Sequence, residues 1–165
     1  MFELRANQDG RISKKTRVAK KINPKALANE NQECRTWLDW SKLVSYRGEP
    51  LSERIVKIPN ERGKAGASIA ILIGLGMRPG FQDYLVMAPS VGRSGRLYGG
   101  LLLEMKTADG GRVDSDQVKW RDKAIRFGYH AEICSGGIAM IEATKAYFEF
   151  IGAVASGAFH DRTRI

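Results

Sequence analysis

The sequence predicts an α/β domain in which helices flank a small mixed β-sheet. Two observations support this fold class. Segments with the apolar spacing of helices alternate along the chain with short segments typical of strands. In addition, the segment "YGGLLLEMK" at 98–106 is apolar enough to be a central strand. The 165 residues suit one domain, which we expect at 29–152, between a basic, flexible arm at 1–28 and a loosely attached tail at 153–165.

The first half of the chain predicts two helices and a strand. Apolar and aromatic residues at 29–46 follow the spacing of an amphipathic helix, which the turn "RGEP" ends. The segment "ERIVKIPN" at 53–60 alternates like a strand that stops at Pro59, because proline cannot donate to a strand ladder. The segment "GKAGASIAILIGLG" at 63–76, rich in small and apolar residues, is typical of a helix with a glycine at its end.

The second half of the chain predicts the rest of the sheet and its helices. Strands at 83–88 and 98–106 are joined by the loop "PSVGRSGRL", and neighbouring strands connected in this way pair as an antiparallel hairpin by default. A helix at 114–128 and a strand at 129–134 follow, and a helix at 137–152 closes the domain. This interleaving of helices and strands favours a mixed sheet.

The composition is that of a globular protein with a basic surface. The hydrophobic share is 43% and the charged share is 27%. The longest apolar run, "ASIAILIGLG", is too short to span a bilayer, and no secretory signal is visible, so we expect a cytoplasmic protein with no membrane partner. Cys34 and Cys134 form no metal-binding pair and are expected to be buried. Trp37, Trp40 and Trp120 have helical spacing and are expected in the core or an interface rather than as stacking platforms for bases.

An excess of positive charge favours a polyanionic partner, nucleic acid first. The chain has 27 Lys and Arg against 18 Asp and Glu, a net charge of +9. The alternative is that the basic residues of the arm and of the hairpin loop are simply solvated. The candidate contacts to DNA phosphates are Lys14, Lys15, Lys20, Lys21, Arg93 and Arg96.

An acid and a base follow one another on one face of the apolar strand. Side chains alternate along a strand, so Glu104 and Lys106 point to the same side while Met105 points to the other. The alternative interpretation is an exposed ion pair on an edge strand. The apolar run "GLLLE" argues against that alternative, because a central strand rarely carries exposed ions.

The hairpin brings a second carboxylate to this pair. If Ala88 lies opposite Gly99, Asp83 falls opposite Glu104, and opposed Cβ atoms lie roughly 4.5–5.5 Å apart. Two carboxylates that close repel each other, so the site either shares a proton or expects a cation. A hard divalent ion such as Mg²⁺ or Mn²⁺, which prefers oxygen ligands, resolves the conflict, and the backbone carbonyl of Met105 offers a further oxygen.

These residues resemble the motifs of the PD-(D/E)XK nuclease superfamily and, within it, the virus-type replication-repair nuclease (VRR-NUC) domain. The chain departs from the family pattern where Phe81 and Gln82 replace an apolar residue and a proline, and where Cys34 replaces a frequent glutamine. The resemblance implies a restriction-endonuclease-like core. It rests on "ENQECRTWLDW", "IPN", "GLGMRPGFQDYLV", "GGLLLEMKT", "DQVKW" and "GYHAEICSG".

The resemblance also implies the roles of the residues at the strand ends. Asp83 and Glu104 would bind Mg²⁺ or Mn²⁺. Lys106 would orient the attacking water and offset charge at the phosphate.

Two helices are expected to supply the remaining site residues. The resemblance implies a helical glutamate that completes the metal shell, and spacing to Trp40 favours Glu30 over Glu33. Gln117 matches the family's glutamine, which contacts water or phosphate near the metal. Its alternative role is structural, as the third helical residue of a capping box begun by Asp114. Both roles of Gln117 stay open.

The resemblance implies a Mg²⁺- or Mn²⁺-dependent endodeoxyribonuclease that hydrolyses phosphodiester bonds. Small stand-alone members of the family resemble structure-selective enzymes, and a two-fold homodimer places two active sites on one branched DNA. We therefore expect a Holliday-junction-resolving enzyme of phage type, acting in recombination or repair in a bacterial or phage-infected host. Two alternatives stay open: a flap or nicking nuclease without junction preference, and a non-catalytic DNA-binding accessory protein.

Overall fold

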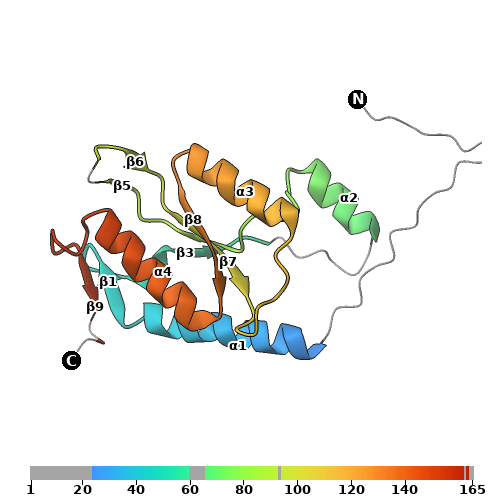
Figure 1. Cartoon of the computed structure of the whole chain (residues 1–165), viewed down its shortest axis with the longest axis horizontal. Helices are drawn as coiled ribbons and strands as arrows, with labels where there is room; N and C mark the ends of the chain where they lie inside the picture. The colour runs from blue at the N-terminus through green and yellow to red at the C-terminus, as the bar shows by residue number, and fades with distance from the viewer. Residues whose placement is uncertain (1–23, 60–65, 93, 162, 164–165) are drawn as a thin grey trace, which may run out of the picture.

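The core of the protein is a four-stranded mixed sheet between two layers of helices (Figure 1). Helix α3 (Ser115–Arg126) covers one face, and α1 (Pro24–Ser41) and α4 (Gly137–Phe150) cover the other. The predicted fold class is thereby confirmed. The strands, in spatial order, are β3 (Ile55–Lys57), β4 (Tyr84–Val86), β7 (Leu101–Lys106) and β8 (His130–Ser135). The computed structural model describes residues 24–59, 66–92, 94–161 and 163.

The central hairpin has the register that the sequence predicts. Strand β4 runs antiparallel to β7, with Tyr84 opposite Leu103 and Leu85 opposite Leu102. One step further along this register, Asp83 falls opposite Glu104. The loop between the two strands forms a small ladder of its own, β5 (Ser90–Val91) with β6 (Leu97–Tyr98). Strand β8 joins β7 in parallel, which helix α3 makes possible as the crossover connection.

The alternation of β7 separates the core from the face that carries the ionic residues. Leu101, Leu103 and Met105 are fully buried in the main core, which α1 and α4 cover. Leu102 points the other way and joins a smaller apolar cluster with Ala124 of α3. Glu104 and Lys106 have the same parity as Leu102, so they lie on the α3 face of the sheet.

The first helix begins earlier and ends earlier than predicted. It starts at Pro24, inside the segment that we assigned to the arm, because the fixed φ of proline suits the first helical turn. It ends at Ser41, and the residues that follow form strand β1 (Val44–Tyr46). Val44 and Tyr46 are buried while Leu43 is exposed, which is the alternation of a strand. The predicted helix at 42–46 and the predicted boundary at 28 are therefore wrong.

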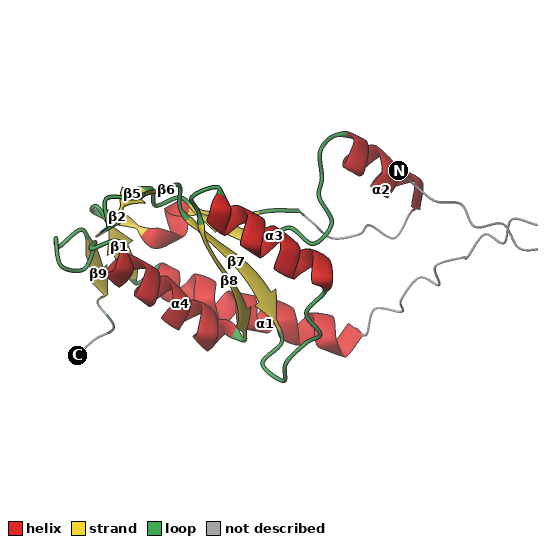
Figure 2. Cartoon of the chain, turned by 45° about the horizontal axis from the view of Figure 1, so that its top comes forward, coloured by secondary structure: helices red, strands yellow, loops and turns green. Residues whose placement is uncertain are grey.

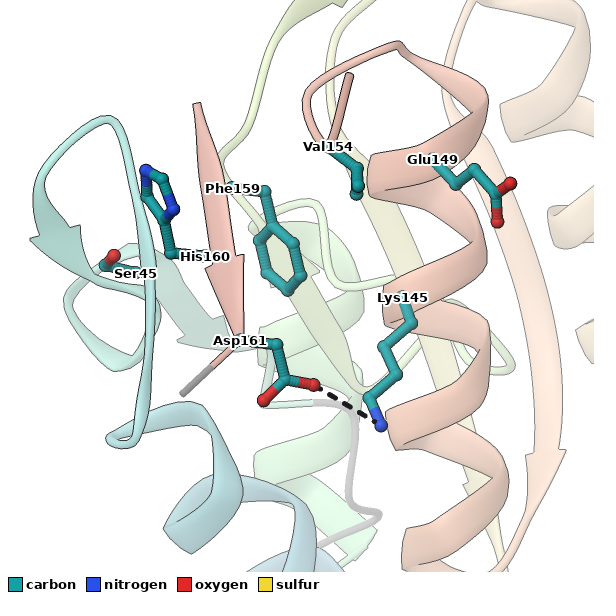
Figure 3. Close-up of a pocket in the computed structure, with 7 residues that line it drawn as sticks. All are labelled: Ser45, Lys145, Glu149, Val154, Phe159, His160 and Asp161. Carbon is teal, nitrogen blue, oxygen red and sulfur yellow. Dashed lines mark ion pairs between the residues drawn. The ribbon is translucent and has the colours of Figure 1, made fainter. Parts of the chain in front are cut away.

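The C-terminal segment is part of the fold, against our expectation of a loose tail. Strand β9 (Phe159–Asp161) pairs antiparallel with β1. The buried ring of Phe159 stacks on Phe148 of α4 at a centroid distance of 4.4 Å. Beside it, Lys145 Nζ lies 3.4 Å from Asp161 Oδ2, at the edge of an open hollow of about 660 Å³ (Figure 3). The prediction is thus wrong for 153–161.

Helix α2 (Gly66–Gly74) projects from the rest of the domain (Figures 1 and 2). It is strongly apolar, yet Ile71 is 64% exposed, and Leu75, just beyond its end, is 79% exposed. None of the helices in the described ranges has both the length and the apolar run that crossing a membrane needs. The two remaining elements are β2 (Glu49–Pro50), which pairs with β1, and the 3₁₀ helix η1 (Leu51–Arg54).

Candidate active site

The central hairpin sets two carboxylates side by side. Asp83 immediately precedes β4, and its Oδ2 accepts a hydrogen bond of 3.0 Å from the backbone N of Met105. Met105 follows Glu104 directly in β7, so this bond fixes Asp83 next to Glu104. The predicted neighbours are therefore neighbours in the structure. The role of the Met105 carbonyl as a metal ligand stays a prediction.

Only one of the two carboxylate oxygens of Glu104 accepts a hydrogen bond from the described residues. Its side chain is 3% exposed. Oε1 accepts hydrogen bonds from Lys106 Nζ, at 2.8 Å, and from Gln117 Nε2. Oε2 is buried, and no hydrogen-bond donor among the described residues reaches it. A buried carboxylate oxygen without a donor is costly and calls for an external partner.

The charge balance around Glu104 favours the binding of a cation. Burial, followed by the negative charge of Asp83, raises the pKa of Glu104 from its ordinary value of 4.5 to about 7. The hydrogen bond and charge of Lys106 lower this pKa only in part, and the charge of Glu30 raises it further. One ammonium group therefore faces several carboxylates.

The two candidate helical glutamates differ in what they contact. Glu33 Oε2 accepts a 2.7 Å hydrogen bond from the backbone N of Gly137, at the first turn of α4. This contact joins α1 to α4, and a carboxylate is favourable at a helix N-terminus. Glu30 lies one helical turn earlier, close enough to the carboxylate pair to act on the pKa of Glu104. The structure thus places Glu30, the residue that the spacing favours, near the pair; its role as a ligand stays a prediction.

Gln117 contacts both the start of α3 and the buried acid, while its contact with water or phosphate stays a prediction. Its Oε1 accepts a 2.9 Å hydrogen bond from the backbone N of Asp114, which completes the capping box at the start of α3. Its Nε2 donates to Oε1 of Glu104. An amide side chain can do both because it carries a donor and an acceptor. The start of α3 is thereby bonded to the buried acid.

Gln82 and Cys34, which depart from the family pattern, are both buried and hydrogen-bonded. Gln82 is buried, and its Nε2 donates to the backbone O of Gln117 at 3.5 Å, so it ties the turn before Asp83 to α3. The sequence does not predict this contact, because no local pattern links a turn to a helix 35 residues further along the chain. Cys34 is buried in the core, where its thiol is hydrogen-bonded to Tyr84. Neither departure displaces Asp83 from Glu104.

Arg96, the predicted phosphate contact that falls among the described residues, does not lie at the carboxylate pair. Arg96 Nη2 donates to the backbone O of Ile125 at 2.8 Å, near the C-terminal end of α3. Gln117, which contacts Glu104, lies at the opposite end of that helix, about 12 Å away along its axis. The other predicted contacts lie outside the described residues: Lys14, Lys15, Lys20, Lys21 and Arg93.

The carboxylate pair suits a divalent ion that the substrate helps to bind. No cluster of three or more His, Cys, Asp or Glu in the described ranges could hold a metal ion by itself. Mg²⁺, however, is usually held by one or two carboxylates together with waters and substrate phosphates. Asp83 and the unpartnered Oε2 of Glu104 provide such a partial site. The donor set therefore fits a hard divalent cation with an open coordination sphere.

Comparison with known proteins supports the fold. No protein-family model matches the chain, and no curated protein matches it. Among solved structures, the chain is similar to a VRR_NUC domain protein, with a TM-score of 0.62 and 21% sequence identity. The similarity covers 74% of this chain and 89% of that chain. The chain thus has the fold of a VRR-NUC domain, as its motifs predicted.

Proposed function

We propose that this protein is a nuclease that hydrolyses phosphodiester bonds of DNA with the help of Mg²⁺ or Mn²⁺. The observation that supports the proposal is the buried Glu104 beside Asp83, with one carboxylate oxygen unpartnered and Lys106 adjacent. A protein that only bound DNA would gain nothing from these carboxylates, because they repel each other and the phosphates. The VRR-NUC fold agrees with this function.

Each side chain of the site has a distinct task in the proposed reaction. Asp83 and Glu104 would hold the metal ion together with the Met105 carbonyl, and Glu30 would complete the shell through a water molecule. When bound, such an ion lowers the pKa of a water molecule, polarises the scissile phosphate and stabilises the leaving oxygen. Lys106 Nζ orients the attacking water and offsets charge on the phosphate.

The neighbours of Glu104 keep its carboxylate in one orientation. Gln117 Nε2 and Lys106 Nζ both bond to Oε1, which leaves Oε2 as the oxygen available to the ion. Because Gln117 is itself held by the capping box, this orientation is set before substrate binds. The site is preorganised by the start of α3.

We further propose that the enzyme is a homodimer that resolves four-way junctions. Exposed helix α2 supports the dimer, because a helix that is apolar on all sides is normally covered. Its sequence "GASIAILIG" has no charged residue, so two copies of α2 meet without like-charge repulsion. A two-fold dimer of this kind places two active sites on one branched DNA.

Charged substitutions in α2 test the dimer. We expect Ile71→Asp combined with Leu75→Asp to convert a dimer into a monomer of unchanged helix content, because two buried aspartates per protomer oppose association. Sedimentation and circular dichroism measure the two properties. Leu97→Asp, at an exposed leucine of β6, is the matched control and stays dimeric. A wild-type monomer at high protein concentration, or a dimeric α2 variant, contradicts this interface.

A cleavage assay tests the function itself. The full chain is incubated with Mg²⁺ or Mn²⁺ on a labelled four-way junction, a flap, a single strand and a plain duplex. We expect symmetric nicks in the junction, and binding that weakens steeply with salt because phosphate contacts dominate. Equal cutting of flaps favours a general flap or nicking nuclease. Tight binding without any metal-dependent product favours an accessory protein and contradicts the proposal.

A further inference from the structure

An apolar recess of about 170 Å³ lies between α3 and the neighbouring face of the sheet. Leu85 of β4 and Leu102 of β7, which pair across the strands, contribute to its lining. Four aromatic side chains, Phe81, Trp120, Phe127 and Tyr129, also line it. We call this site the aromatic recess.

The aromatic recess is next to the carboxylate pair. Leu85 lies two residues after Asp83, and Leu102 lies two residues before Glu104. Residues two apart on a strand share a face, and their Cα atoms are about 7 Å apart. The lining residues of the recess and the two acids are therefore neighbours on one surface of the sheet. The recess begins beside the acids, at Leu85 and Leu102, and extends to Phe127, which lies about 15 Å from Gln117 along the axis of α3. A DNA strand bound at the acids would therefore pass over the recess with its neighbouring nucleotides.

The rings of the recess are available to a ligand. Phe127 is 71% exposed, and Trp120 is only partly buried, unlike Trp37 and Trp40, which belong to the core. The rings of Phe81 and Trp120 meet edge to face at a centroid distance of 5.5 Å. Exposed aromatic rings beside a backbone-binding site are the usual platform on which unpaired bases stack. Trp120 is therefore the tryptophan for which a stacking role fits the structure.

A lysine at the recess indicates the charge of the ligand. Lys123 Nζ lies 4.5 Å from the ring centroid of Trp120 and 5.8 Å from that of Phe127. A purely apolar ligand would bury this ammonium group without a partner, which is costly. A nucleotide offers a flat ring for the aromatic side chains and a phosphate for the lysine. Lys119, exposed one turn earlier on α3, adds a second cation.

We propose that the aromatic recess binds an unstacked base of the DNA substrate, within about two nucleotides of the scissile phosphate. This inference rests on the proposed nuclease function. A base must leave its stack to enter such a pocket, and the cost is smallest for a base that is already unpaired. The recess thus selects DNA whose stacking is interrupted near the cut, as it is at the branch point of a four-way junction. Its apolar lining provides stacking rather than base-specific hydrogen bonds, so selection is for shape.

Binding of single-stranded DNA to the full chain, measured in EDTA so that no cutting occurs, tests this inference. We expect Phe127→Ala to weaken binding by about tenfold, which corresponds to the loss of one stacked base. An oligonucleotide in which every base is replaced by an abasic site should bind the wild type more weakly by a similar factor. The abasic and the intact oligonucleotide should bind Phe127→Ala with equal affinity, because this variant lacks the ring on which the base would stack. Ile138→Ala, at an exposed apolar residue of α4, is the control and keeps wild-type affinity.

Tryptophan fluorescence gives a second readout that a change in folding would not imitate. Since Trp37 and Trp40 are buried, quenching by DNA should come from Trp120 and disappear in Trp120→Phe. The same variant keeps a ring and should retain affinity within about threefold. If the chain cleaves DNA but neither Phe127→Ala nor the abasic strand changes the affinity, the proposed binding of a base in the recess is wrong. The nuclease function would then still stand. A chain that neither binds nor cuts DNA overturns both.

Discussion

Glu104→Gln is expected to raise the free energy of unfolding of the metal-free protein by about 3 kcal/mol at pH 8. The native pKa of Glu104, about 7, lies above its ordinary value of 4.5. Between these two values the native state holds a proton that the unfolded state has lost, so wild-type stability falls as the pH rises through this window. Above the native pKa the full penalty of the buried charge is present, and the substitution removes it.

The geometry around Glu104 suits this substitution. The amide oxygen can still accept hydrogen bonds from Lys106 and Gln117, and the new NH₂ group can donate toward Asp83. Urea unfolding in EDTA measures the difference, which should shrink below about 1 kcal/mol at pH 5, where most of the penalty is absent. Glu53→Gln, at an exposed carboxylate, is the control. A variant that is no more stable than wild type at pH 8 contradicts the account.

Glu104→Gln and Lys106→Met are each expected to slow metal-dependent DNA cleavage by at least about 10²-fold to 10³-fold, but for different reasons. Glu104→Gln removes a charged ligand and should weaken metal binding as well. Lys106→Met removes the group that faces the phosphate and the attacking water, so it should leave metal binding intact. Initial cleavage rates on the preferred DNA, together with metal titrations, separate the two roles.

The paired measurements also distinguish loss of function from loss of fold. Glu104→Gln should combine raised stability with lost activity, which a misfolded variant cannot show. Lys42→Met, at an exposed lysine that pairs with Asp39, controls for the removal of one positive charge from the basic chain. Cleavage that survives in Glu104→Gln, or equal loss of metal binding in both variants, would reject this division of roles.

The part of the site that the sequence predicts depends on local pairing. Two strands joined by a short loop pair by default, and the period of two along "LLLEMK" decides which side chains share a face. Together these rules place Asp83 beside Glu104, and the structure has that register. The apolar composition of the strand indicates that Glu104 is buried, as it is.

The remaining differences arise from contacts between distant segments. Strand β9 pairs with β1, more than a hundred residues earlier, and no local pattern in "AFHD" specifies that partner. The sequence predicts that Arg96 either contacts DNA or is solvated, and it does not predict the hydrogen bond that Arg96 donates to the carbonyl of Ile125 at the end of α3. Gln117 belongs to the capping box and also contacts Glu104, because the start of α3 and the buried acid meet at one point. Such convergence depends on tertiary structure.

Titration of Mn²⁺ into the full chain bound to a non-hydrolysable DNA analogue at pH 8, followed by calorimetry, tests most directly whether the buried acids form a cation site. We expect saturable binding to the wild type and binding weaker by at least about tenfold to Glu104→Gln, because one charged ligand of a partial site is lost. Absence of saturable binding by the wild type, or equal affinity of the two proteins, would contradict the account.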